Sequence, residues 1–475
     1  MWGFEDGLLA CPVLRRGLCA ALLLVLGPAC TTEPADRTAE ATGGRVPPEE
    51  LTGSSSPVSS CRAGRHLRFD PYSADARWER RIQAIVGDLP VGVAVGIGGR
   101  LVYAHDARRL RVPASNQKLL LSFALLDRLG SHYRIPTSAA ATDIEGGTVT
   151  GDLWVMGRGD PTLTANEPGY WGDVEATTLA ELAARIERAG IRQIAGSVMG
   201  ATGYFEHDLA APGWQPYVPR RYVQLPTSLV LNGNHAGAAS PERAVAAALT
   251  KELEKTGVSV NGAPGAGAPP VRSTPVTGVG SRPLTEIVAY MNHTSNNFFA
   301  ETLGKLLGAE VFGPPGTIQK GARAIESWAS AHGVHAVAHD SSGLSYRNRI
   351  SPRSIVELLG VAETKPWGRA LRDHLPGAGE GTLRYRLPGL QVRAKTGTLF
   401  NGASALSGWV RSAKGGRWAA FSILDRSAPK AIEDRIVRVI SRARVRSPRP
   451  DSPGLCGARP SGPDPKLAGS SGPRP

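Results

Sequence analysis

Residues 112–120 read VPASNQKLL and place Ser115 three residues before Lys118. A polar segment gives way here to an apolar run with helical spacing, so Lys118 should lie one turn beyond Ser115 on the same face. Two interpretations fit: the serine caps a helix, or it is a nucleophile whose proton passes to the lysine. This stretch alone does not separate them.

Two further motifs follow in order along the chain. Ser295-Asn296-Asn297 lies at a polar break between two apolar helical runs, where side chains can point into a cleft. Lys395-Thr396-Gly397 lies in QVRAKTGTL (391–399), which has the pattern of a strand; glycine within a strand often marks close approach by a ligand or another backbone. The ordered set of Ser-x-x-Lys, Ser-x-Asn and Lys-Thr-Gly is typical of β-lactamases and penicillin-binding proteins, and it favours the nucleophile.

The first motif, Ser-x-x-Lys, and the third, Lys-Thr-Gly, each occur a second time in the chain. Lys255-Thr256-Gly257 ends an amphipathic segment that begins at Ser240, and its glycine is expected as a helix stop. Ser427-Ala428-Pro429-Lys430 follows all the other candidates, and its proline suits the start of the last helix. We interpret both repeats as helix-terminal segments without a catalytic role.

The predicted chemistry depends on how Lys118 loses its charge. A serine hydroxyl is a poor nucleophile unless a neighbouring group takes its proton, and a lysine accepts a proton only when neutral. Burial lowers the pKa of a lysine, and a second nearby cation, here Lys395, lowers it further. We expect Lys118 to be the acylation base and Ser295 to relay the proton to the leaving amine. This chemistry requires no metal and no cofactor.

The remaining motif residues are expected to bind the substrate. Lys395 and Thr396 would hold a terminal carboxylate by charge and hydrogen bonding. Gly397 would leave room for the substrate to lie along the strand as an added β-partner, and Asn297 would hold a substrate amide. The backbone N–H groups of Ser115 and Thr398 would form an oxyanion hole.

Bulk composition narrows the function class. The chain has 475 residues, 41% of them hydrophobic and 20% charged, which is ample for a core and unlike a disordered protein. A net charge of +14 fits nucleic acid, an anionic wall or membrane, or solubility alone. No C-x-x-C zinc spacing, helix-turn-helix signature or aromatic-basic stripe is present, so we expect no nucleic-acid partner.

The first residues resemble an export signal. Arg15 and Arg16 precede an apolar run, residues 17–27, that is too short to span a bilayer. We expect a signal peptide over 1–30, a flexible linker over 31–70, and an exported protein in the periplasm or cell envelope. Membrane attachment is expected only if Cys30 carries a lipid.

The pattern of elements predicts an α+β fold. A hairpin signal over 91–106 and three strands between 390 and 425 should pair into one antiparallel sheet covered by helices. The sheet domain would then consist of residues 71–132 and 283–446, interrupted by a smaller inserted α/β domain at 133–282. Residues 447–475 read as a disordered tail.

From about Val91 to Asp425 the chain resembles the D-alanyl-D-alanine carboxypeptidase/endopeptidase family, the low-molecular-mass class C penicillin-binding proteins. Besides the three motifs, the resemblance lies in five segments: PASNQKLLLSFALLDRLG (113–130), GRGDPTLT (157–164), PTSLVLNGN (226–234), DSSGLSYRNRISP (340–352) and LPGAGEGTLRYRL (375–387). It implies a β-lactamase/transpeptidase-like domain with an insertion between the first two motifs.

The resemblance also implies an activity. Such an enzyme removes the terminal D-Ala of peptidoglycan stem peptides or cuts their cross-links, through an acyl-enzyme on Ser115, and is acylated by β-lactam antibiotics such as penicillins. Asp160, in GDPTL, is a candidate for contacting the free amine of a stem-peptide side chain; the alternative is a turn-forming residue before Pro161. Asn296 stands where the family often has Asp, and the family's nested third domain looks reduced or absent.

Two other functions remain open. A β-lactamase would share the three motifs, although the long insertion and the absence of an obvious deacylating glutamate disfavour it. A non-catalytic penicillin-binding envelope protein could retain the fold, although the intact motifs argue against it.

Overall fold

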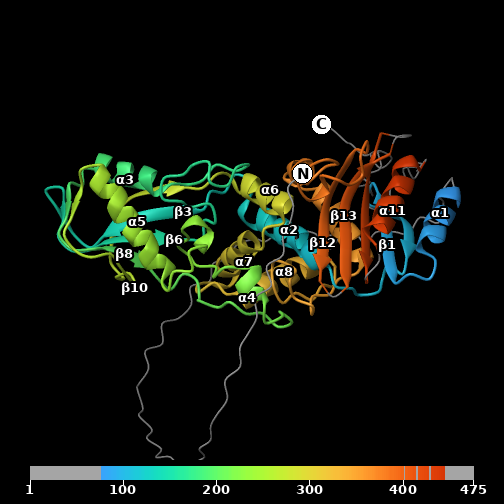
Figure 1. The fold of residues 1–475 in the computed structure, drawn as a ribbon, viewed down its shortest axis with the longest axis horizontal. Coiled ribbons are helices and arrows are strands. Elements are labelled where there is room, and N and C mark those ends of the chain that lie inside the picture. The colour runs from blue at the N-terminus through green and yellow to red at the C-terminus, as the bar shows by residue number, and fades with distance from the viewer. Residues whose placement is uncertain (1–75, 401, 413–415, 427–428, 444–475) are drawn as a thin grey trace, which may run out of the picture. The chain divides into compact units, whose positions relative to one another are not determined.

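The main sheet joins the two ends of the described chain. The computed structural model describes residues 76–400, 402–412, 416–426 and 429–443. Five antiparallel strands lie in the order β12-β13-β14-β1-β2 (Figure 1). Their bounds are β1 (Val91–Ile97), β2 (Arg100–His105), β12 (Val392–Leu399), β13 (Ala403–Arg411) and β14 (Trp418–Asp425). The predicted α+β class with an antiparallel sheet is confirmed.

The pairing of β1 with β14 brings the segment before the first motif against the end of the described chain. Its register runs from Val91 opposite Asp425 to Gly96 opposite Ala420. All seven residues of β1 are buried, as expected for an interior strand covered on both faces. Gly98 and Gly99 both have positive φ, which the tight turn to β2 requires and which glycine adopts without steric cost.

Helices cover both faces of this sheet. The terminal helices pack on one face, where Trp78, Ile82 and Val86 form a buried stripe at i, i+4 and i+8. The remaining helices of the domain form the other layer and carry two of the three motifs. The bounds are α1 (Ala76–Val86) and α11 (Lys430–Arg442) for the first layer, and α2 (Gln117–Leu129), α6 (Leu284–Thr294), α7 (Asn297–Phe312), α8 (Ile318–Ala331), α9 (Pro352–Glu363) and α10 (Gly368–Asp373) for the second.

The chain between α2 and α6 forms two sheets of its own. The larger, of order β10-β8-β6-β3-β11, is mixed, because β8 runs parallel to β6 and β10 while β3 is antiparallel to its neighbours. The smaller has the order β4-β5-β7-β9. Their bounds are β3 (Pro136–Ala141), β6 (Leu153–Gly157), β8 (Val198–Ala201), β10 (Gly265–Gly267) and β11 (Thr274–Gly280), then β4 (Ile144–Glu145), β5 (Thr148–Val149), β7 (Gln193–Ile194) and β9 (Ser259–Val260).

Two amphipathic helices complete the core of this inserted part. They are α3 (Leu179–Arg188), capped by Thr178, and α5 (Pro241–Lys255), capped by Ser240 with Pro241 at its first position. Both contribute to one hydrophobic cluster with the strands. A single turn of helix, α4 (Val218–Arg221), lies between β8 and α5, in a stretch that packs against Ala114 of the main domain.

Some expectations fall outside the described residues. The signal peptide (1–30), the linker (31–70) and the tail (447–475) cannot be compared with the structure for this reason. In the described ranges, every helix is too short or too polar to cross a membrane.

Candidate active site

Ser115 lies in a short 3-10 segment, Ala114–Asn116, that leads directly into α2. Its side chain caps no helix: the residue at the N-cap of α2 is Asn116, and no side-chain capping bond forms there. Asn116 instead donates to the Lys395 carbonyl at 2.9 Å and so ties this segment to β12. The capping interpretation of Ser115 therefore fails, and its hydroxyl faces the side chain one turn further on.

Lys118 is the polar centre of the site. Its Nζ donates to Ser115 Oγ at 3.3 Å, to Asn297 Oδ1 at 2.8 Å and to the Ser342 carbonyl at 2.6 Å. The side chain is fully buried, and this burial lowers the pKa of Lys118 to about 8 although the carboxyls of Asp340 and Glu301 act in the opposite direction. A substantial fraction of Lys118 is thus neutral near physiological pH and available to accept a proton.

The second motif lies at the junction of α6 and α7. Ser295 takes a left-handed conformation, φ 56° and ψ 36°, directly after α6, and Asn296 caps α7 by accepting from the Phe299 N–H at 3.0 Å. The break between the two helices, predicted at this place, therefore presents Ser295 and Asn297 on the same side as Lys118. Asn296 has a capping role, which an aspartate at the same position could also fill.

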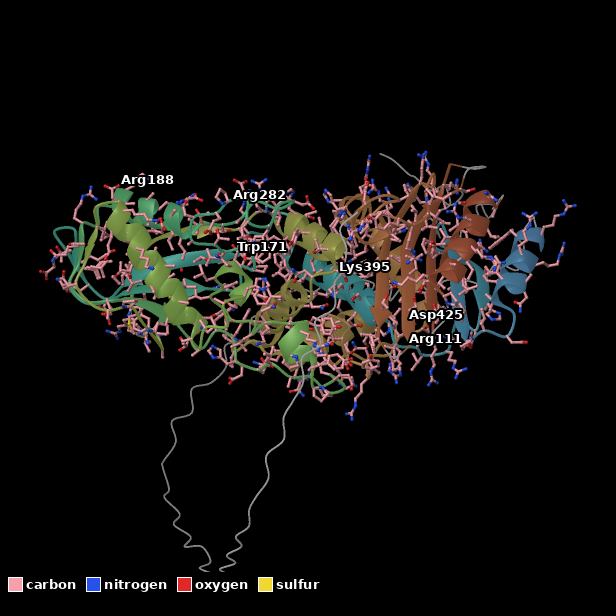
Figure 2. The ribbon with its side chains drawn as sticks, viewed as in Figure 1. Arg111, Trp171, Arg188, Arg282, Lys395 and Asp425 are labelled. Atoms are coloured by element: carbon pink, nitrogen blue, oxygen red, sulfur yellow. The ribbon has the colours of Figure 1, made fainter. Side chains whose placement is uncertain are left out.

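The third motif lies on β12, the edge strand next to Ser115. Lys395 is fully buried and donates to Ser295 Oγ and to the Thr396 carbonyl, both at 2.9 Å. It lies between the helical layer and the sheet (Figure 2). Burial, together with the charges of Lys118 and Lys430, lowers the pKa of Lys395 well below its usual value.

Gly397 is the point of closest approach between β12 and the nucleophile segment. A Cβ at this position would lie 3.0 Å from the Pro113 carbonyl oxygen and 3.1 Å from Ala114 Cβ. Any larger residue would push the strand away from Ser115. The structure gives a steric reason for glycine at this position, because the backbone of the first motif occupies the space; the predicted room for a substrate along the strand stays a prediction.

All three motifs border one open cavity of about 670 Å³. Lys118 and Lys395 are buried behind its wall, whereas Ser115, Ser295 and Thr396 line it. The full lining is Ser115, Asp173, His293, Thr294, Ser295, Gly381, Thr382, Arg384, Tyr385, Arg386, Thr396, Gly397, Thr398 and Lys430. An extended peptide that lay along β12 in this cavity would pass Ser115.

The comparisons with known proteins agree with this geometry. Residues 91–238 and 224–443 match the model of the D-Ala-D-Ala carboxypeptidase 3 (S13) family. The chain belongs to this family.

Two curated relatives support the assignment to the S13 family. A D-alanyl-D-alanine carboxypeptidase of Actinomadura sp. (strain R39) is 29% identical over 464 residues, which cover 77% of this chain and 83% of the relative. A carboxypeptidase of Mycobacterium tuberculosis is 31% identical over 351 residues, covering 67% of this chain and 71% of the relative. This S13 member is accordingly an enzyme of the carboxypeptidase class.

A solved structure shares the fold. Penicillin binding protein 4 from Haemophilus influenzae superposes with a TM-score of 0.62 at 20% identity, over 76% of this chain and 98% of that one. The same protein has also been solved in complex with a β-lactam. At this level of identity the likeness establishes the β-lactamase/transpeptidase-like fold of the S13 chain.

Asp160 does not lie among the residues that line the cavity. Its carboxylate is almost fully buried and accepts hydrogen bonds from Thr162 N–H at 2.9 Å, Thr162 Oγ1 at 2.7 Å and Thr177 Oγ1 at 2.5 Å. Burial raises the pKa of Asp160, and these hydrogen bonds act against that rise. The geometry matches the turn-forming alternative for GDPTL, in which the aspartate closes its own loop.

Sequence reasoning missed other residues of the cavity. Among the described residues that line the cavity, Asp173 carries the acidic side chain. It comes from the loop after GDPTL, where no sequence pattern distinguishes it. Lys430 donates to Thr398 Oγ1 at 2.7 Å, so the repeat interpreted only as a helix start also contributes a cation to the site. Thr382 belongs to none of the three motifs, yet it accepts from Thr396 Oγ1 at 2.9 Å. Its segment, 375–387, is indicated in the sequence only by the family resemblance.

Proposed function

We propose that the chain is a serine D-Ala-D-Ala carboxypeptidase that forms an acyl-enzyme on Ser115. Neutral Lys118 accepts the Ser115 proton as the oxygen attacks the carbonyl carbon of the penultimate D-Ala. The tetrahedral oxyanion is stabilised by the backbone N–H groups of Ser115 and Thr398. The observation that carries the proposal is the contact of one buried amine with both the Ser115 hydroxyl and the second motif.

The leaving amine receives its proton through Ser295. The proton taken up by Lys118 passes to Ser295 and from there to the nitrogen of the departing D-Ala, while the C–N bond breaks. Lys395 supports this relay because its Nζ is hydrogen-bonded to Ser295 Oγ. Water then attacks the ester by the reverse sequence and releases the shortened peptide and free Ser115.

The terminal carboxylate of the substrate binds at the far end of the cavity from the acyl chain. Thr396 and Thr398 present hydroxyl groups there, and Lys395 and Lys430 contribute positive charge. Opening of a β-lactam places an acyl group on the same oxygen, so penicillins are expected to act as inhibitors. Cleavage of D-amino-acid cross-links, the endopeptidase reaction, uses the same groups if the open cavity accepts the longer peptide.

We assign the free amine of a stem-peptide side chain to Asp173 rather than to Asp160. The Asp173 carboxylate lines the cavity, whereas the Asp160 carboxylate is used by its own loop. Asp173→Asn should raise KM for a substrate with a free side-chain amine and leave KM for its N-acetylated form unchanged. Equal effects on both substrates would remove this assignment.

Mass spectrometry of the penicillin-treated protein tests the central proposal. An adduct on the peptide that contains Ser115, absent from Ser115→Ala, is expected, together with D-Ala release from a D-Ala-D-Ala peptide. An adduct elsewhere, or D-Ala release by Ser115→Ala, would overturn the mechanism. Rapid turnover of a chromogenic cephalosporin without D-Ala release would instead indicate a β-lactamase.

A further inference from the structure

One face of α7 carries three polar side chains at intervals of one turn. Asn297, Glu301 and Lys305 follow at i, i+4 and i+8, and Glu301 and Lys305 are fully buried. Asn297 binds Lys118, as described above. Glu301 and Lys305 belong to none of the three motifs. Buried ionisable groups of this kind require specific partners.

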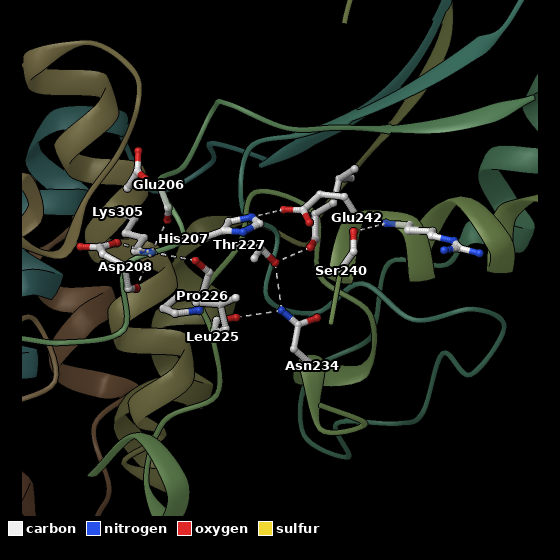
Figure 3. A network of polar contacts seen from close by, with 12 residues as sticks. Glu206, His207, Asp208, Leu225, Pro226, Thr227, Asn234, Ser240, Glu242 and Lys305 are labelled. Carbon is white, nitrogen blue, oxygen red and sulfur yellow. Dashed lines mark hydrogen bonds and ion pairs between the residues drawn. The ribbon is translucent and has the colours of Figure 1, made fainter. Parts of the chain in front are cut away.

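The buried amine of Lys305 binds groups of the inserted part. Its Nζ donates to the carbonyls of Glu206 at 2.8 Å, Asp208 at 3.1 Å and Pro226 at 2.9 Å, and pairs with the Asp208 carboxylate (Figure 3). These partners lie in the stretch between β8 and α5, within the inserted part. Lys305 therefore fastens the insertion to α7 and does not contact Lys118.

Glu301 points to the loop that follows α8. Its Oε1 accepts from the backbone N–H of Ser342 at 2.8 Å and of Ser341 at 3.2 Å. The carbonyl of the same Ser342 accepts from Lys118 Nζ at 2.6 Å. A single residue thus connects the buried carboxyl of Glu301 with the amine proposed as the base.

The loop itself is rigidly built around Asp340. This carboxylate accepts from Gly343 N–H at 3.0 Å, Ser345 N–H at 2.7 Å and Trp214 Nε1 at 2.7 Å. Gly343 packs so closely on the nucleophile segment that a Cβ there would clash with the Ala114 carbonyl oxygen. Asp340 and Gly343 thus hold the loop on either side of Ser342, and Glu301 supplies the acceptor for the Ser342 N–H itself.

We propose that Glu301 is a positioning residue for acylation: it holds the Ser342 carbonyl against Lys118 and places a buried carboxyl beside that amine, and so sets the pH at which Lys118 takes the Ser115 proton. The inference rests on the proposed role of Ser115 and Lys118. It concerns a residue that touches neither the substrate nor the reacting oxygen.

The charges around Lys118 Nζ decide whether loss of the Glu301 carboxyl raises or lowers the pKa of Lys118. Lys118 is faced by Lys395 from β12, by Glu301 from α7 and by Asp340 from the loop, and Glu301 is itself faced by Lys305 one turn further along α7. Burial and the Asp340 carboxyl raise the pKa of Glu301 to about 8, while the Ser342 N–H favours its ionised form. When ionised, Glu301 stabilises the charged form of Lys118; removal of that charge should lower the pH at which Lys118 becomes neutral.

The test is the pH dependence of penicillin acylation in E301Q, with E242Q as the matched control. Glu242 is equally buried and pairs with His207 in the inserted part (Figure 3), so the same substitution removes a buried carboxyl away from Lys118. The acid-limb midpoint in E301Q should fall by about one pH unit because the charge is lost, while the plateau rate stays at the wild-type value because the Gln side-chain oxygen can still accept from the Ser342 N–H. The E242Q midpoint and plateau should equal those of the wild type.

E301D separates charge from position. The shorter carboxyl keeps its charge but does not reach the Ser342 N–H, so the plateau should fall while the midpoint stays at the wild-type value. A midpoint in E301Q equal to that in E242Q would overturn the proposal, and so would a wild-type plateau in E301D if E301Q does not fold. Absence of a Ser115 adduct in the wild type would instead count against the proposed function.

Discussion

The tripeptide Lys-Thr-Gly occurs in two regions of this chain and has a different structural role in each. At 395–397 it lies in the edge strand β12, where Lys395 is fully buried and bonded to Ser295. At 255–257 it ends α5, where Lys255 keeps 63% of its side chain exposed and pairs with Glu252. The same tripeptide is buried and bonded to the second motif only where a second layer of structure surrounds it.

The glycines show the difference most directly. Gly257 has φ +87°, and a Cβ at this position would meet no atom within 4 Å, so backbone conformation alone selects glycine there. Gly397 has an extended conformation but three close neighbours, so space selects it. One glycine ends a helix, and the other allows the first and third motifs to touch.

Replacement of the two lysines should give the largest contrast. Lys395→Met should slow penicillin acylation by about 10³-fold, because Ser295 loses the hydrogen bond from Lys395 Nζ and the substrate carboxylate, whose charge favours the protonated amine, loses its partner. Lys255→Met should leave the acylation rate unchanged, since it removes only a surface pair. Stopped-flow acylation of both folded variants measures this, and equal rates would break the comparison.

Replacement of the two glycines should give the next largest contrast. Gly397→Ala should slow acylation by roughly 10- to 100-fold, because the new Cβ would displace β12 from Pro113 and Ala114. Gly257→Ala should reduce the free energy of unfolding by about 1 kcal/mol through its positive φ and not affect acylation. Rates and thermal unfolding of both variants check this; a fast Gly397→Ala enzyme would contradict the steric role.

The pH dependence of the wild-type rate is the third test. The pKa of Lys118 is lowered from 10.5 to about 8, and only its neutral form accepts the Ser115 proton. Acylation should therefore rise about tenfold per pH unit below that value and level off above it. Lys255→Met should give the same curve, and a flat wild-type profile would show that another group takes the proton.

Replacement of the threonines in the two Lys-Thr-Gly copies should give the smallest contrast in acylation rate. Thr396→Val removes a hydroxyl that lines the cavity and binds Thr382, and should slow acylation by about threefold to tenfold, the effect of one neutral hydrogen bond. Thr256→Val removes only a bond to the Leu253 carbonyl and should lower thermal stability slightly with no change in rate. A larger kinetic effect at Thr256 than at Thr396 would reverse the comparison.

Local elements were predictable because their signals are local. The hairpin β1–β2, the break between α6 and α7 and the capped start of α5 all follow from turn residues, caps and periodicity within a few positions. Helix α9 continues through Gly360 to Glu363, because packing of the helix rather than a local stop signal sets its end. Helix α8 was not predicted, although Thr317 before it is a residue type that favours the N-cap and makes a capping bond there.

The site was predictable only as a set of residue types. Ser115, Lys118, Ser295, Asn297 and Lys395 were identified from motif order, yet their distances depend on the packing of α2, α7 and β12. Asp173 carries no pattern, Lys430 lies in a Ser-x-x-Lys match that was interpreted only as a helix start, and Asp160, which lies in GDPTL, is turned into its own loop. The sequence indicated that Asp160 lies in a turn or a site, but it could not show where its carboxylate points, because the fold of the loop decides that.

The sequence by itself determined the hairpin, several helices and strands, and where the three motifs occur along the chain, since capping, periodicity and glycine placement act over a few residues. Only the tertiary structure decided that Lys118 is buried between Ser115, Asn297 and Ser342, and that Glu301 holds the last of these from behind. Burial and charge at one amine arise from segments far apart in the sequence, so the lowered pKa of Lys118 is a property of the packed layers.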